Sequence, residues 1–457
     1  MLRGMGSCTV VATGFASYVA AVGVLGNRVY RRLFVAQVVA LVGSGLATVA
    51  LGLLAHRLAG GDAGLVLGVA LAIKMVAYVF FAPVATALAE RLPRRAFLVA
   101  MDVVRAAVAL VLPFVTEVWQ VYALIVVLQA ASASFTPTFQ ATIPTVLPDE
   151  DDYTRALSLS RLAYELESLL SPVLAAALLT VVGASQLFVG TAVGFAASAL
   201  LVLSVVLPKP VESANRSVGG MRVYLATPRL RALVGLNVAA AAAGSMVLVN
   251  TVVVVREDLG LSDSSVALTL GAYGAGSIVA AVLLPRVLTR VGERHVMLGG
   301  AGVLVFVLAA SAFLPLSWAG VLVAWAALGL SGAAVQTPIG RLVRRSAKPG
   351  GWPRLFAAQF TVSHGGWLVT YLLAGLLGAW AGMSFTLLLL AMVAAGGVLF
   401  AARVWPAHDP STVEHVHDNL APDDPHLLGA VARGGGWVHA HEFAIDRVHP
   451  RWPQRPR

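Results

Sequence analysis

The sequence has little charge and almost no cysteine. Only 12% of its residues are charged and 58% are hydrophobic, whereas soluble domains carry roughly a quarter of charged residues. The hydrophobic residues form long runs, which excludes an ordinary soluble domain and predicts many membrane-spanning helices. Cys8 is the single cysteine, so no intrachain disulfide can form.

The sequence also lacks the motifs of membrane-embedded enzymes. No apolar run holds an HExxH, a GxSxG or a cluster of carboxylates, and no catalytic domain is evident in the polar tail. We therefore expect neither an enzyme nor a bound cofactor.

Twelve apolar stretches have the length of about 20 residues that crosses a bilayer. The predicted spans are 33–54, 65–88, 97–116, 119–143, 157–182, 187–207, 231–255, 265–288, 296–315, 318–342, 355–380 and 384–404. They predict an all-α membrane protein embedded in a lipid bilayer.

The basic residues are distributed unevenly between the loops. If Arg28, Arg31 and Arg32 lie in the cytoplasm, the loops on the opposite side hold only Arg57 and Arg256. The loops on the cytoplasmic side hold Arg91, Arg94, Arg95, Arg155, Lys209, Arg216, Arg222, Arg229, Arg231, Arg286, Arg290, Arg294, Arg341, Arg344, Arg345, Lys348 and Arg354. This positive-inside pattern places both ends of the bundle in the cytoplasm. We expect the protein in the inner membrane of a bacterium. The pattern also accounts for the net charge of +10, so we expect no nucleic-acid partner.

The polar segments divide the chain. Residues 28–207 and 231–404 form two sets of six spans, joined by a cytoplasmic linker at 208–230. Residues 405–457 form a polar tail of the composition that is typical of poor order. Residues 1–27 have a weak resemblance to a signal peptide and are also consistent with an upstream-extended start or an interfacial segment.

The two sets of spans show an internal repeat. "TALAERLPRR" (86–95) follows the second span and "PRVLTRVGER" (285–294) follows the eighth, at an offset of 199 residues. The fourth and tenth spans also end comparably, with Thr-Pro at 136–137 and at 337–338. Two repeated six-helix halves are typical of transporters whose substrate path lies between the halves.

The first of these segments resembles the loop motif G-x-x-x-D-R-x-G-R-R of the major facilitator superfamily. The match has Thr86 and Pro93 in place of glycines and Glu90 in place of the aspartate. The resemblance covers residues 28–404 and implies a twelve-helix transporter that alternates its access between the two sides. It also implies a gating role for this loop and its weaker second copy, in Glu90, Arg91, Arg94, Arg95, Arg290 and Arg294.

The fifth span, "SRLAYELESLLSPVLAAALL", contains charged residues. A charge at the bilayer centre costs about 2.5–3.5 kcal/mol on insertion scales and usually has a function. On a helix, Arg161, Glu165 and Glu167 border a polar arc opposite a continuous leucine face. Arg161 can pair with Glu165 four residues later, and this pair is also consistent with an inter-helix clamp. Glu167 lacks that partner and is the better candidate for a group that takes up a proton.

The eleventh span carries the counterpart of this polar arc. The offset of 199 residues aligns Glu165 with His364 and Pro172 with Tyr371. His364 is therefore a candidate substrate ligand or proton partner, although a lone buried histidine is also consistent with a hydrogen-bonded core residue.

Four further polar residues in the spans are candidates for the substrate or proton pathway. Lys74 needs a counter-ion, for which Glu167 and Asp102 are available. Asp102 and Arg105 lie one turn apart and are also consistent with a local ion pair, and Asn250 lies in the seventh span.

Histidines are concentrated in the tail. Seven of the ten follow Pro406, and His415–His417 and His439–His441 form two H-x-H pairs. In an extended chain residues i and i+2 point the same way, so each pair could bind one ion such as nickel, copper or zinc. A solvated tail with biased composition is the alternative.

The segments "YELESLLSP", "VNTVVVV" and "SHGGWLVTYLLAG" resemble the branch of enterobactin and macrolide exporters. Within this branch the chain resembles the NreB-type nickel-resistance permeases, which also carry histidine-rich C-termini. The resemblance implies export.

These patterns together predict a secondary transporter of the major facilitator type that couples efflux to proton entry. A divalent cation such as nickel is favoured as the substrate because of the tail, with a small organic compound as the alternative. A membrane sensor that reads metal through the tail without transport is the alternative of another class.

Overall fold

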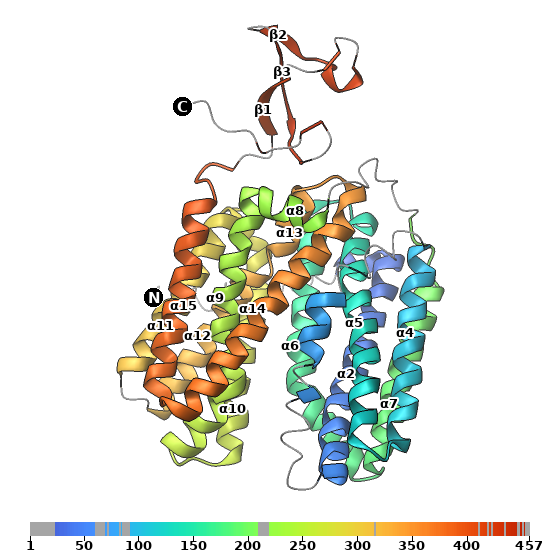
Figure 1. The fold of residues 1–457 in the computed structure, drawn as a ribbon, viewed down its shortest axis with the longest axis vertical. Helices are drawn as coiled ribbons and strands as arrows, with labels where there is room; N and C mark the ends of the chain where they lie inside the picture. Colours follow the sequence, from blue (N-terminus) through green and yellow to red (C-terminus); the bar gives the residue numbers. More distant parts are fainter. Residues whose placement is uncertain are drawn as a thin grey trace, which may run out of the picture.

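The protein is two bundles of helices that lie side by side, with a small sheet of the tail beyond one end of the helices (Figure 1). The computed structural model describes residues 23–59, 69–70, 73–81, 84, 92–208, 219–314, 317–409, 412–417, 420–421, 424–433, 436–445, 448–449 and 452. The side chain of Glu165 and the whole of Glu90 and Arg91 lie outside the described residues.

The N-terminal half contains five helices with described bounds. They are α2 (Arg28–Ala59), α4 (Arg94–Val111), α5 (Val118–Val146), α6 (Glu150–Leu179) and α7 (Ala184–Leu203), with 3-10 turns η1 (Val24–Gly26) and η3 (Leu112–Phe114). Residues 73–81, within the predicted second span, are helical as well.

The C-terminal half and the tail follow in chain order. The helices are α8 (Gly220–Ala226), α9 (Pro228–Val253), α10 (Asp263–Leu288), α11 (Glu293–Phe313), α12 (Trp318–Gln336), α13 (Ile339–Arg345), α14 (Trp352–Trp380) and α15 (Met383–Val404). The shorter elements are the π turn η4 (Val254–Asp258) and the 3-10 turns η5 (Pro349–Gly351) and η6 (Pro425–Leu427). The strands are β1 (Thr412–His417), β2 (Val431–Arg433) and β3 (Gly436–Glu442).

The helices fit a bilayer in length and composition. Among the described residues, nine helical stretches are long and apolar enough to cross a membrane. The more polar α6 and the long α14 pack among them. The all-α membrane fold predicted from the apolar runs is confirmed.

The two halves repeat the same packing scheme. In the N-terminal half α7 packs on α2 and α4, α4 on α5, and α2 on α6. In the C-terminal half α15 packs on α9 and α11, α11 on α12, and α9 on α14. Since each pairing has a counterpart, the structure agrees with the repeat that the sequence indicated.

A pair of glycines allows one of these pairings to be very close. A Cβ atom built on Gly235 of α9 would lie 2.2 Å from the carbonyl oxygen of Gly397 in α15, and one built on Gly397 would lie 2.4 Å from that of Gly235. Small residues at such crossings are the usual means by which membrane helices approach each other.

Two segments differ from the prediction. The linker 208–230 includes the short helix α8, which packs on α14 and α9. The tenth span is divided at Pro338 into α12 and α13, because proline cannot donate the hydrogen bond that would continue α12.

The described residues of the tail form a folded unit, which corrects the expectation of poor order for this part of the chain. Its strands form an antiparallel sheet in the order β1-β3-β2. Composition alone was a poor guide here, because His415 pairs with His439 and Val416 with Val438 across the sheet.

Candidate functional site

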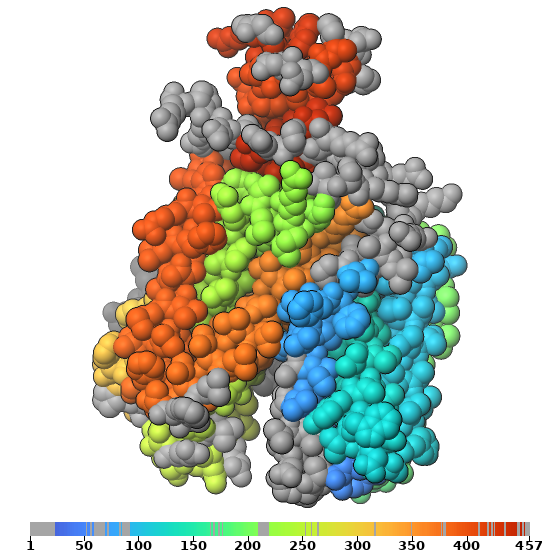
Figure 2. Space-filling model, viewed as in Figure 1, coloured from blue at the N-terminus to red at the C-terminus, as the bar shows by residue number. Residues whose placement is uncertain are grey.

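A cavity of about 530 Å³ lies between the two halves. Its lining comes from α2, residues 74–78, α4, α5 and α6 on one side, and from α9, α12, α13 and α14 on the other. Figure 2 shows α14 of the C-terminal half beside residues 73–81 of the N-terminal half, where Phe360 contacts Tyr78. Cavities between the halves are where this type of bundle binds its substrate.

The polar arc of α6 faces this cavity. Tyr153, Ser160, Arg161, Tyr164 and Glu167 line it and recur at three- and four-residue spacing along one helix face. Leu166, Leu170 and Leu174 on the opposite face are exposed, as expected for side chains that meet lipid. The inward orientation predicted for the polar arc therefore agrees with the structure.

His364 and Tyr371 of α14 line the cavity from the other half. The Nδ1 atom of His364 lies 2.8 Å from the carbonyl oxygen of Phe360 and therefore donates to it, so the neutral ring keeps a lone pair on Nε2. The ring contacts that of Phe360 at 4.0 Å with a tilt of 33° and meets the edge of Tyr78 at 4.7 Å (centroid distances). His364 is thus held in an aromatic contact that bridges the two halves.

The charges along the cavity are mainly positive. Lys74, Arg105 and Arg161 line it, and Glu167 is the only acidic residue among its described lining residues. Aromatic rings also contribute to the wall, from Tyr78, Phe135, Phe139, Tyr153, Tyr164, Phe356, Phe360, Trp367 and Tyr371. A wall of rings with a few charged groups is the usual form of a site for a small organic molecule.

Asp102 is part of a buried ion pair and is not among the described residues that line the cavity. Its carboxylate accepts hydrogen bonds from Arg105 and from Ser198 Oγ, the latter at 2.8 Å. The Arg105 guanidinium lies between the rings of Phe135 and Phe195, at 4.3 and 4.5 Å. The local ion pair considered from the sequence is the arrangement observed, with Arg105 reaching the cavity.

Asn250 likewise lies away from the cavity. Its side chain is buried and donates to the carbonyl oxygen of Ala374 at 3.2 Å, which ties α9 to α14. Asn237, also on α9, lines the cavity instead and exchanges two hydrogen bonds with Gln359 of α14. Sequence reasoning missed Asn237, although an amide in a span is the same signal that singled out Asn250.

Arg161 joins the halves across the cavity wall. Its guanidinium donates to Ser277 Oγ of α10 at 3.3 Å and to Gln336 Oε1 of α12 at 3.1 Å. The predicted pairing with Glu165 involves a side chain outside the described residues.

A second connection between the halves lies at the end of the helices nearer the tail. Arg341 of α13 contacts Glu150 Oε1 of α6 at 2.7 Å, Thr154 Oγ1 at 2.7 Å and Glu293 Oε1 of α11 at 3.1 Å. Glu150 lies in the first turn of α6, where Asp149 caps the helix and acidic groups interact favourably with the helix dipole. We call Arg341, Glu150, Thr154 and Glu293 the inter-half clasp.

The clasp extends to the tail. Arg345 contacts Glu293 Oε2 at 3.7 Å and Asp409 Oδ2 at 2.7 Å. Asp409 also lies 3.6 Å from Arg229 and accepts from the indole nitrogen of Trp405 at 3.0 Å. A continuous series of ionic contacts therefore runs from the start of the tail to the N-terminal half.

The residues that the loop motif suggested for gating have different positions. Arg94 is buried, and Arg95 donates to the carbonyl oxygen of Val205 at 3.4 Å. Arg294 donates to the carbonyl oxygens of Trp405 and Ala402, and Arg290 is exposed just after α10. None of these four takes part in the described contacts of the clasp, which sequence reasoning missed because Arg341 was one of many loop arginines.

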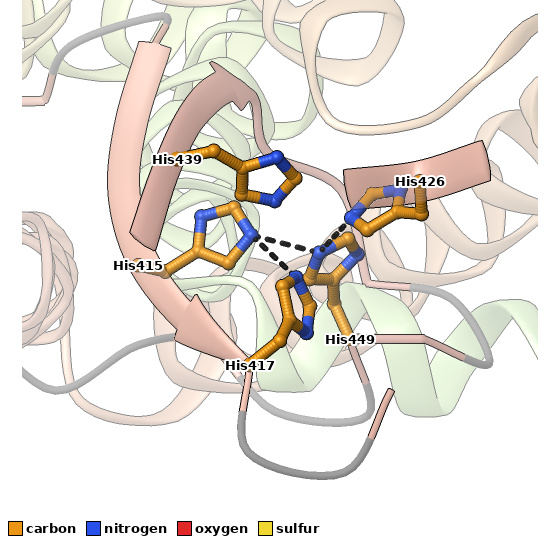
Figure 3. Close-up of side chains that lie close together, drawn as sticks. All are labelled: His415, His417, His426, His439 and His449. Carbon is orange, nitrogen blue, oxygen red and sulfur yellow. Dashed lines mark hydrogen bonds between the residues drawn. The ribbon is translucent and has the colours of Figure 1, made fainter. Parts of the chain in front are cut away.

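Six tail histidines gather at one place, and five of them are shown in Figure 3. We call them the histidine cluster: His415, His417, His426, His439, His441 and His449. In the register of the sheet His415 lies opposite His439, and His417 and His441 are two residues further along β1 and β3, so these four share one face. His426 of η6 and His449 cover that face.

The surroundings keep three of the cluster's rings neutral. Burial, followed by the charges of neighbouring imidazoles, lowers the pKa of His417, His426 and His439 to about 4. At neutral pH these rings can each offer a lone pair to a metal ion. The sequence predicted the two H-x-H pairs as separate sites, whereas the structure brings both pairs together and adds His426 and His449.

The comparisons with known proteins agree with this architecture. The family model of the Major Facilitator Superfamily matches residues 33–242 and 233–432. No curated protein matches the sequence.

Solved transporter structures are similar in fold. The human organic anion transporter MFSD10 (TETRAN) has a TM-score of 0.70 at 14% identity, covering 82% of this chain and 99% of that one. A bacterial homologue of the iron transporter ferroportin in an outward-facing state has a TM-score of 0.65 at 15% identity, covering 82% and 98%. A variant of the E. coli fucose:proton symporter FucP has a TM-score of 0.65 at 14% identity, covering 83% and 98%. At these identities the likeness extends to the fold alone.

Proposed function

The chain belongs to the major facilitator superfamily of membrane transporters, and from this premise we propose that it is a proton-coupled exporter of a small organic compound that carries negative charge. The observation that carries the proposal is the cavity between the halves, whose described lining includes three cations, one carboxylate and nine aromatic rings. Its size of about 530 Å³ is within the usual range for small-molecule sites.

The charges of the lining favour an organic anion over a metal ion as the cargo. A divalent cation would meet Lys74 and Arg161 with Glu167 as the single carboxylate in the described lining. An anionic compound would instead be held by charge-assisted hydrogen bonds, which are about twice as strong as neutral ones. Aromatic rings would contact the rest of such a molecule.

Glu167 is the proposed proton carrier. It is half-buried, lines the cavity and shares that wall with Lys74. When Glu167 is ionised it compensates one cation of the lining. Proton uptake or release at Glu167 changes the net charge of the cavity, so proton binding and substrate binding are linked. Export driven by proton entry requires that the proton and the substrate occupy the cavity in turn.

A divalent metal such as nickel, favoured from the sequence, is the second candidate. The histidine cluster supports it, since this is the only group of potential metal ligands found among the described residues. The cluster lies in the tail and not in the cavity. A membrane sensor that reads metal through the tail is the third possibility, and a transport assay separates it from the other two.

The proposed location is a bacterial inner membrane, with the tail in the cytoplasm. A cysteine introduced at the exposed Ala407 in a Cys8→Ser background would be the single cysteine in the chain. In intact cells we expect it to resist a membrane-impermeant maleimide and to react only after lysis. Labelling in intact cells would place the tail outside.

The function is tested by transport. An efflux-deficient host expressing the protein is challenged with aromatic acids, neutral drugs, nickel, cobalt and zinc, and any protective activity is then followed in inverted vesicles with a pH-sensitive dye. We expect protection against an anionic compound, and proton release from the vesicles when that compound is added.

Single-residue variants test the proposed roles of Glu167 and His364. Glu167→Gln is expected to abolish proton coupling, His364→Ala to weaken substrate binding, and Glu117→Gln, at the exposed start of α5, to behave like the wild-type protein. Protection against metals alone would favour the second candidate, and protection that survives intact in Glu167→Gln would remove the proposed proton carrier.

A further inference from the structure

The six rings of the histidine cluster have an octahedral arrangement. The centroid of each ring lies 4.7–5.1 Å from those of four others, while His415 and His426 are 6.5 Å apart. In an octahedron each corner has four equal neighbours and one opposite corner. His415 and His426 are therefore opposite corners.

The nitrogen atoms converge at the spacing of metal ligands. The Nε2 atom of His415 lies 3.0 Å from those of His417 and His449, and the Nε2 atom of His426 lies 3.1 Å from that of His449 and 3.2 Å from that of His441. Adjacent nitrogens around an octahedral ion with bonds of about 2.1 Å are about 3.0 Å apart, whereas in a tetrahedron they are about 3.4 Å apart. The observed distances fit the octahedron.

Hydrogen bonds between neutral rings cannot account for this arrangement. His415 and His441 each donate Nδ1–H to a backbone carbonyl, of Val413 at 3.0 Å and of Glu442 at 2.8 Å. Each neutral ring has one N–H, so the Nε2 atoms of both can only accept.

The contacts between the rings then conflict. Because His441 can only accept, His426 has to donate its Nε2–H in their contact. His426 is then also the donor in its contact with His449, and His449 has to accept. The contact between His449 and His415 would then join two acceptors. A cation at the centre removes the conflict because it receives the lone pair of every ring.

His439 is a second and independent indication. Its Nε2 atom is shielded from solvent and has no hydrogen-bond partner among the described residues, although it faces the other rings (Figure 3). A buried polar atom without a partner is costly, and a metal ion is the partner that these neighbours suggest.

The surroundings orient the ligands. The carbonyls of Val413 and Glu442 fix two rings in the tautomer that presents Nε2, as outer hydrogen bonds do in known metal sites. Phe443 packs against His415 and His449 at 5.1 and 4.7 Å and contributes an apolar wall.

We propose that the tail binds one divalent first-row transition-metal ion in an octahedral site made of the six rings of the histidine cluster, with Ni²⁺ as the preferred ion. The site is separate from the cavity and does not depend on what the cavity transports.

The preference follows from geometry and intrinsic affinity. Zn²⁺ favours four ligands in a tetrahedron, and Cu²⁺ favours a tetragonal site. Among ions that accept six equal ligands, affinity rises from Mn²⁺ through Fe²⁺ and Co²⁺ to Ni²⁺, and imidazole suits the last of these well.

The test uses the full-length protein in detergent, purified with an affinity tag that contains no histidine. Binding of Ni²⁺ and Co²⁺ is measured by equilibrium dialysis, and the metal environment by X-ray absorption at the metal edge. We expect one ion per chain, six nitrogen neighbours at about 2.1 Å, and the weak visible bands of octahedral Co²⁺.

Two variants test the ligands separately. His439→Ala removes a strand ligand and His426→Ala removes one outside the sheet, so a fault in sheet folding would affect them differently. We expect each to lose at least tenfold in Ni²⁺ affinity and to show fewer nitrogen neighbours. His408→Ala, outside the cluster, should bind as the wild-type protein does.

The proposal is overturned if the wild-type protein binds Ni²⁺ and Co²⁺ no more tightly than the double variant His426→Ala/His439→Ala does. It is also overturned if the bound ion has four ligands. Since the readouts are binding and spectroscopy, failure of the transport proposal would leave them unchanged.

Discussion

At the scale of single residues, Lys74 and Glu167 contribute opposite charges to the wall of the cavity. Glu167 comes from the face of α6 that the helical period had selected. Lys74 could be singled out because a lysine in the middle of an apolar run requires a partner or a function.

Lys74→Ala is expected to weaken substrate binding. A hydrogen bond to a charged group contributes about 1.5–3 kcal/mol, which corresponds to roughly a tenfold or larger rise in KM. Lys74→Arg should retain most of the affinity. Arg403→Ala, which removes an exposed cation at the end of α15, serves as the control. An unchanged KM in Lys74→Ala would show that the substrate does not use this charge.

Gly45→Ala is expected to disturb the wall near Glu167. A Cβ atom at this position would lie 1.9 Å from Ser171 Oγ and 2.9 Å from Glu167 Oε1, so α2 and α6 would have to shift. Overpacking of this kind costs about 1–3 kcal/mol, which a lower melting temperature would report.

Two further variants make this prediction specific. Ser171→Gly in the same chain should restore much of the loss, because the clashing side chain is removed. Gly302→Ala in α11, where a Cβ meets nothing within 4 Å, should be neutral. Equal destabilisation by the changes at 45 and 302 would contradict the packing argument.

At the scale of elements, α6 and α13 meet through the inter-half clasp. Arg341 has partners in both halves. A single exposed ion pair contributes at most about 1 kcal/mol to the stability of the fold. We therefore expect the clasp to act mainly by favouring the conformation in which the two halves meet at this end.

Arg341→Ala is expected to shift the population toward states in which the halves separate at the tail end. Spin labels on cysteines at positions 151 and 348, in a Cys8→Ser background, would report a longer distance in the variant. Arg231→Ala, which removes an exposed arginine of α9, should leave the distance distribution as it is. A distribution that does not move in Arg341→Ala would mean that other contacts hold this end closed.

The elements also show what the sequence can and cannot predict. The twelve apolar runs, the repeat and the inward face of α6 follow from length and period, which depend on local sequence. The pairing of β1 with β3 joins His415 to His439 across an intervening segment, and no local period reveals such a pairing. Similarly, Arg341 and Glu150 are far apart in sequence, and their contact depends on how the halves meet.

At the scale of the whole molecule, the tail is attached to the C-terminal half by specific contacts. Asp409 contacts Arg345 and Arg229, and the ring of Trp452 lies 4.9 Å from the guanidinium of Arg229. The tail therefore has a defined position relative to the clasp.

Asp409→Asn is expected to loosen this attachment while leaving the sheet intact. Hydrogen exchange should become faster in α13 and at the start of the tail, with the exchange of β1 and β3 unchanged. Asp424→Asn, within the tail, offers a comparison that leaves the contacts with Arg345 and Arg229 in place. Equal effects of the two variants would contradict a special role for Asp409.

The histidine cluster has a consequence for the chain as a polymer. His415 and His449 are 34 residues apart, so an ion held by both would close this stretch into a loop, as a disulfide does, and would reduce the freedom of the unfolded tail. With Cys8 as the only cysteine, this cross-link would depend on metal supply alone. Limited proteolysis with and without nickel measures this cross-link. The ion should protect the wild-type tail and fail to protect the tail of His426→Ala/His439→Ala. The rate of tail cleavage would then depend on the concentration of metal around the protein.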